Sequence, residues 1–60
     1  MTNAAQYASR AIAFEDARDY AAAQYNFTMA AIVETSPKSK KNWQRCADEC
    51  HALMREAAKR

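Results

Sequence analysis

The sequence contains no glycine and a single proline, and β-branched apolar residues are scarce. Ile12, Ile32 and Val33 are its only isoleucine or valine residues, so a β-sheet has almost no material from which to form. Glycine and proline are the residues that helix interiors tolerate least, and alanine, which occurs fifteen times, is the one they favour most. The composition therefore predicts an all-α protein.

Long apolar runs are also missing. The stretch Met29–Val33 is only a few residues long, whereas a helix needs about 20 apolar residues to span a bilayer. The opening residues, MTNAAQ, lack the basic-then-apolar pattern of a secretory signal peptide. We therefore expect a cytoplasmic protein that does not enter a membrane.

Residues that could carry chemistry are few. Cys46 and Cys50 would share one face of a helix, as two metal ligands would. His51, the only histidine, would point about 100° away from Cys50, and no further cysteine or histidine is present to complete four ligands. We interpret the cysteines as small apolar residues. A dimer linked through them is an alternative that a cytosolic setting disfavours.

The adjacent carboxylates of Glu15 and Asp16 could serve acid–base chemistry if they were buried together. Neighbours on a helix point in different directions, so we interpret them as surface charge. No set of nucleophile, base and orienting group is recognisable. The sequence predicts a protein that is not an enzyme, with no cofactor and no metal site.

Helix-start signals divide the chain into three parts. Asn3 is followed three residues later by Gln6, as in a capping box. Asp19 is a good N-cap, and Ser36 precedes Pro37, which favours the first position of a helix. One domain of 60 residues is expected, with helices over about residues 4–17, 20–34 and 38–59. Because the connections are short, neighbouring helices should be antiparallel.

The second predicted helix is apolar on two sides. One face consists of Tyr20, Ala23, Phe27, Ala30 and Ala31, and the second face consists of Ala22, Tyr25, Met29, Ile32 and Val33. The first and third helices each carry one apolar stripe, so both can pack against the second helix. The stripe of the third helix consists of Trp43, Cys46, Cys50, Leu53 and Ala57. The second face is then either covered by the third helix as core, or left partly open as a groove for a peptide or a second copy.

The first two helices resemble a tetratricopeptide repeat. Residues 4–35 place an aromatic residue, a small residue and an aromatic residue on the first helix, and a similar alternation on the second: Tyr7, Ala11, Phe14, Tyr20, Ala23, Phe27 and Ala30. Arg18 stands where that repeat usually has a turn glycine. The stretch EDARDYAAAQYNFTMAA is also similar to the microtubule-interacting and trafficking domain, which pairs such a hairpin with a long third helix. The resemblance implies an antiparallel three-helix bundle that binds peptides beside its second and third helices.

Charge is divided unevenly along the chain. Residues 1–35 carry two basic and four acidic side chains, a net charge of −2, and residues 36–60 carry seven basic and three acidic side chains, a net charge of +4. The predicted third helix has basic residues along one side, among them Lys41, Arg45 and Arg55. Such a stripe could contact nucleic-acid phosphates, although acidic residues interrupt it, or it could attract an acidic protein.

These patterns favour a small protein–protein interaction module, an adaptor or regulator that binds a peptide or protein, acidic or helical. The expected binding residues are Tyr25, Met29, Ile32, Val33, Lys41, Arg45 and Arg55. Two alternatives stay open. One is nucleic-acid binding through the basic stripe, and the other is a structural subunit that folds as a homodimer or larger homo-oligomer.

Overall fold

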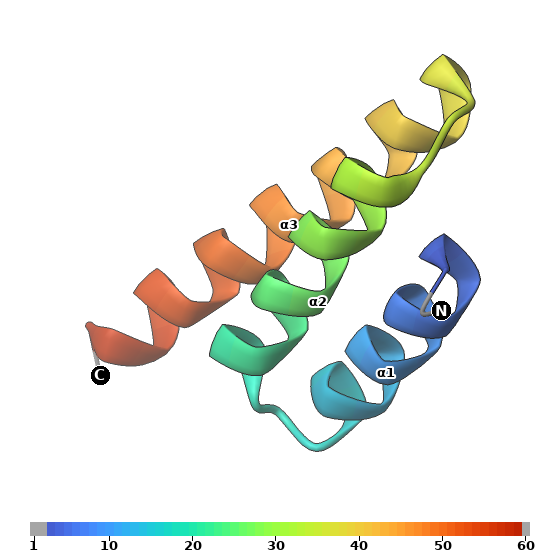
Figure 1. The fold of residues 1–60 in the computed structure, drawn as a ribbon. Coiled ribbons are helices and arrows are strands. Elements are labelled where there is room, and N and C mark those ends of the chain that lie inside the picture. Colours follow the sequence, from blue (N-terminus) through green and yellow to red (C-terminus); the bar gives the residue numbers. More distant parts are fainter. Residues whose placement is uncertain (1–2, 60) are drawn as a thin grey trace.

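The computed structural model describes residues 3–59 and contains three α-helices (Figure 1). Helix α1 spans Ala4–Asp16, α2 spans Tyr20–Val33, and α3 spans Pro37–Ala58. No strand occurs within these residues. The all-α fold class with three helices is confirmed, and every helix end lies within one residue of its predicted position.

Helix α1 is closed at both ends by local hydrogen bonds. Asn3 and Gln6 form a complete capping box, in which each side chain accepts a hydrogen bond from the other residue's backbone N–H, at 2.9 and 3.0 Å. At the other end Arg18 has a φ of 64°. Its N–H donates to the Glu15 carbonyl, and the N–H of Asp19 donates to the Phe14 carbonyl. This is the Schellman arrangement, which usually has glycine at the left-handed position.

The other two helices also begin at the predicted caps. Asp19 accepts a hydrogen bond from the Ala22 N–H at 3.3 Å, which starts α2 one residue later. Ser36 is the N-cap of α3, but its side chain makes no capping hydrogen bond. The Glu34 carboxylate instead accepts from the N–H groups of Thr35 and Ser36, at 3.0 and 3.2 Å, and so orders the connection before Pro37.

Helix α2 lies between the other two helices, which both pack against it (Figure 1). The central cluster draws on all three helices: Ala11, Ala23, Phe27, Ala47 and Cys50. Trp43 and Cys46 pack against this cluster while remaining half-buried. The Phe27 and Trp43 rings are stacked, with centroids 6.1 Å apart. Small residues at the crossings let the helix backbones approach closely.

The core is unusual in the size of its side chains. Apart from Phe27, which is 2% exposed, the buried apolar residues are alanines and Cys50. The larger apolar side chains Ile12, Tyr25 and Ile32 are about half exposed or more. A chain of this length buries only about 60% of its unfolded surface, and here the buried part contains little large apolar material. The isolated bundle is therefore expected to be only marginally stable.

Candidate functional site

The second apolar face of α2 is left largely open. Tyr25 is 62% exposed, Ile32 is 61% exposed and Val33 is 38% exposed, while Met29 and Ala22 are half-buried. We refer to these five residues as the outer face of α2. At about 100° per residue, Tyr25 and Ile32 point away from Ala23 and Phe27, which are turned toward the core. Helix α3 follows the core side of α2 and does not cover this face.

No charged residue interrupts α2. The segment Tyr20–Val33 contains only apolar residues together with Gln24, Asn26 and Thr28. A helix that is apolar on all sides is normally buried on all sides. Here α1 and α3 both pack against α2, but neither covers its outer face, so this face has the character of a contact surface that lacks a partner.

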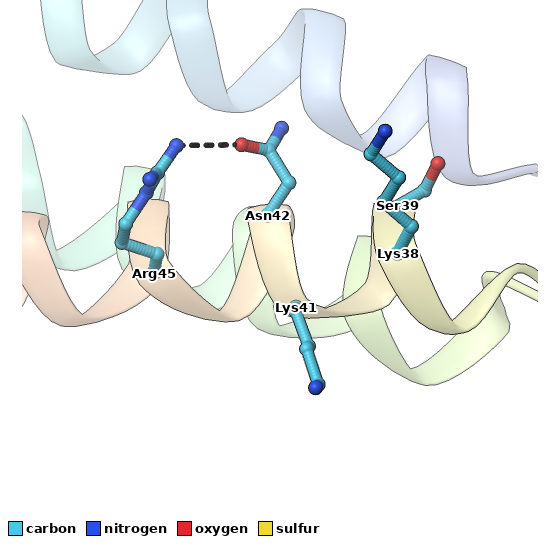
Figure 2. A pocket seen from close by; sticks show the side chains of 5 residues that line it. All are labelled: Lys38, Ser39, Lys41, Asn42 and Arg45. Carbon is cyan, nitrogen blue, oxygen red and sulfur yellow. Dashed lines mark hydrogen bonds between the residues drawn. The ribbon is translucent and has the colours of Figure 1, made fainter.

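Two of the three predicted basic residues lie at the first half of α3. Lys41 and Arg45 belong to a hollow that is lined by Lys38, Ser39, Lys41, Asn42 and Arg45 (Figure 2). Figure 2 shows Lys41 directed away from the other four side chains. The Arg45 guanidinium donates a hydrogen bond to Asn42 Oδ1 at 2.9 Å. Residues 35–47 contain four basic side chains and no acidic one, so this end of the bundle is strongly positive.

Arg55 is separate from this basic end. It lines a second hollow further along α3, together with Ala52, Glu56 and Lys59. Ten residues of helix place Arg55 about 15 Å beyond Arg45, and Asp48 and Glu49 lie between them in the sequence. The three predicted cations therefore do not form one continuous surface, and only Lys41 and Arg45 belong to the strongly positive end.

The two cysteines lie inside the bundle rather than at an open site. Cys50 is fully buried, and its thiol donates a hydrogen bond to Glu15 Oε2 at 3.6 Å. Burial, with the nearby negative charge of Glu15, raises the pKa of Cys50 to about 11. Burial also raises the pKa of Cys46, and the charge of Glu49 adds to that effect. Cys50 belongs to the central cluster and Cys46 packs against it, so both cysteines contribute to the packing of the bundle.

Several residues at these sites were not predicted. Asn26 is only 8% exposed, and its Nδ2 donates to the Ala22 carbonyl at 2.8 Å, one turn earlier in α2. Ser39 and Asn42 line the basic hollow, yet neither carries a sequence signal for binding. Glu15 was interpreted as surface charge, but it is half-buried because α3 passes beside the end of α1.

Within residues 3–59, no helix is long and apolar enough to cross a membrane, and no cluster of three or more histidine, cysteine, aspartate or glutamate residues could hold a metal ion. Comparisons of the chain with protein-family profiles, with curated proteins and with solved structures find no match. The function is therefore inferred from the geometry of the bundle.

Proposed function

We propose that this chain is a small protein-interaction module of the cytoplasm, an adaptor or regulator, and that it binds its partner through the outer face of α2. The observation that carries the proposal is the exposure of Tyr25 and Ile32, at 62% and 61%, on a helix without charged residues. Tyrosine is among the residues that carry most of the binding energy of protein interfaces, and burying an isoleucine side chain adds about 1.5–3 kcal/mol of hydrophobic stabilisation. The resemblance to the trafficking domain, a peptide-binding three-helix bundle, agrees with this function.

The half-buried Met29 adds to the suitability of this face. Met29 lies four residues after Tyr25 and three residues before Ile32, which is the spacing of one helix face, so the three side chains form a single stripe along α2. Methionine is flexible and polarisable, and it adapts to partners of different shape. The stripe fits an apolar helix or peptide laid along α2.

The positive end of α3 would contribute chiefly to the rate of association. Lys41 and Arg45 are exposed and lie in a stretch with no acidic residue. Exposed charges of this kind steer an acidic partner toward the surface and add little to the final affinity. A partner with an apolar stripe flanked by acidic residues would satisfy both features.

The test is capture of partners by the immobilised chain from extracts of its source cells, with interface and control variants compared. The double substitution Tyr25→Lys with Ile32→Lys should abolish capture, because it would bury two charges in the interface. Ile12→Lys is the matched control, since Ile12 is 49% exposed on α1. Circular dichroism should show that all variants remain helical. Capture that survives the double substitution would refute the proposal.

Nucleic-acid binding is a second candidate, supported by the hollow lined by Lys38, Lys41 and Arg45. If these three cations contact phosphates, the logarithm of the affinity for duplex DNA should fall with the logarithm of salt concentration, with a slope of about −3. Fluorescence anisotropy with a labelled duplex measures this slope. Lys41→Glu with Arg45→Glu should remove the binding, whereas a slope near zero would exclude this candidate.

A further inference from the structure

The apolar side chains buried inside the bundle are mostly smaller than those exposed on its surface. The buried apolar residues are mostly alanines, while Tyr25 and Ile32 are left exposed on one face of α2. A 60-residue chain gains little stability from such a core. Association that covered the outer face of α2 would add the large apolar contacts that the isolated bundle lacks.

The two ends of α2 carry opposite charge. The turn before α2, residues 15–19, contains three acidic side chains and one basic side chain, a net charge of −2. The segment after α2, residues 34–47, contains four basic side chains and one acidic one, Glu34, a net charge of +3. Because the two connections lie at opposite ends of α2 (Figure 1), the acidic end and the basic end are separated by the length of this helix.

We propose that the outer face of α2 binds a second copy of this chain, with the two α2 helices antiparallel about a two-fold axis. This arrangement places the acidic end of each copy beside the basic end of the other, so the favourable charge contact occurs twice. A parallel arrangement would place like charges together at both ends. The inference rests on the proposed function, because it names the partner of the same face.

The spacing of the large side chains suits this symmetry. The midpoint between Tyr25 and Ile32 falls between Thr28 and Met29. A two-fold axis at that point places Tyr25 against Ile32 of the partner subunit, and the same contact is repeated on the other side of the axis. No charge within Tyr20–Val33 would have to be buried.

The available area indicates a weak dimer. Helix α2 has 14 residues and is about 21 Å long, so an interface confined to this helix is small. Interfaces at the low end of the size range bury about 600 Å² on each partner. This area is about one seventh of the 4384 Å² accessible surface of the chain. The charged ends of α2 would have to contribute part of the buried area. A dissociation constant in the micromolar range is expected for such an interface.

Sedimentation equilibrium of the purified chain, from about micromolar to millimolar concentration, is the first test. The wild-type chain should form a dimer that Tyr25→Lys with Ile32→Lys weakens at least tenfold and that Ile12→Lys leaves unchanged. A monomer throughout this range, or a dimer indifferent to the double substitution, would overturn the inference. If the chain is monomeric but partner capture still requires Tyr25 and Ile32, only the self-pairing fails and the proposed function stands.

Charge exchange tests the antiparallel orientation separately. Asp16→Lys makes the acidic end more positive, and Lys41→Glu makes the basic end more negative. Each variant alone should dimerise more weakly than wild type. In a parallel arrangement, which brings like ends together, either substitution would reduce the repulsion at one end and so tighten the dimer. A variant that dimerises as tightly as wild type, or more tightly, would refute the antiparallel arrangement.

Discussion

Replacing Ala23 with leucine tests the close helix crossing at the centre of the bundle. Ala23 is 0% exposed, and it shares one cluster with Ala11 of α1 and with Ala47 of α3. A leucine adds a branched group of three carbons at a point where both neighbouring helices already contact α2. The side chain can be accommodated only if the helices move apart or if it adopts an unfavourable rotamer.

The expected cost of this substitution is about 1–3 kcal/mol of unfolding free energy. A 60-residue domain has a total stability of roughly 3–9 kcal/mol, so the loss is a large fraction of it. For a domain of this size each kcal/mol corresponds to about 4–8 °C in melting temperature. We therefore expect the melting temperature to fall by at least about 4 °C, with helical signal retained at low temperature.

Thermal unfolding followed by circular dichroism measures this effect, at one fixed protein concentration so that association does not contribute differently. Ala13→Leu is the matched control, because Ala13 is exposed on α1 and the same carbons are added there without a neighbour. The control should change stability by less than about 0.5 kcal/mol. If Ala23→Leu and Ala13→Leu behave alike, the close crossing at Ala23 is wrong.

Two further predictions concern the turn and the buried thiol. Arg18→Gly should raise stability by about 0.5–1 kcal/mol in urea unfolding, because Arg18 has a φ of 64°, whereas Arg18→Ala, which keeps a Cβ atom, should bring no such gain. The fold raises the pKa of Cys50 from 9.0 to about 11. Between these pH values the unfolded chain releases a proton that the folded chain retains. The free energy of unfolding should therefore fall by about 2–3 kcal/mol as the pH rises from about 9 to about 11. In the Cys50→Ala variant the free energy of unfolding should fall less steeply over the same pH range. An equal fall in the variant and the wild type would contradict the assignment of the effect to Cys50.

The helix boundaries were accessible from the sequence because their signals are local. The capping box of Asn3 and Gln6, the Asp19 cap and the proline that opens α3 all act within one turn of helix. The buried face of α2 was also predicted correctly for Ala23 and Phe27, since helical spacing alone places them on one side.

Predictions that depend on how the three helices pack were less complete. Leu53 belongs to the apolar stripe predicted for the third helix, yet it is 42% exposed because that part of α3 has no neighbour to cover it. Ala47 was not singled out by the sequence, although it is 2% exposed and lies in the central cluster. Alanine is frequent on every face of these helices, so its presence does not distinguish a crossing point from a surface position.

The sequence by itself determined that the chain forms three helices, where each begins and ends, and that α2 is apolar on two sides. These properties follow from intrinsic propensity, capping and periodicity, which act over a few residues. Only the tertiary structure decided which side of α2 remains open and that Cys50 contacts Glu15. Those outcomes depend on how whole helices are rotated and positioned against one another. Contacts between residues that are distant in the sequence set this arrangement.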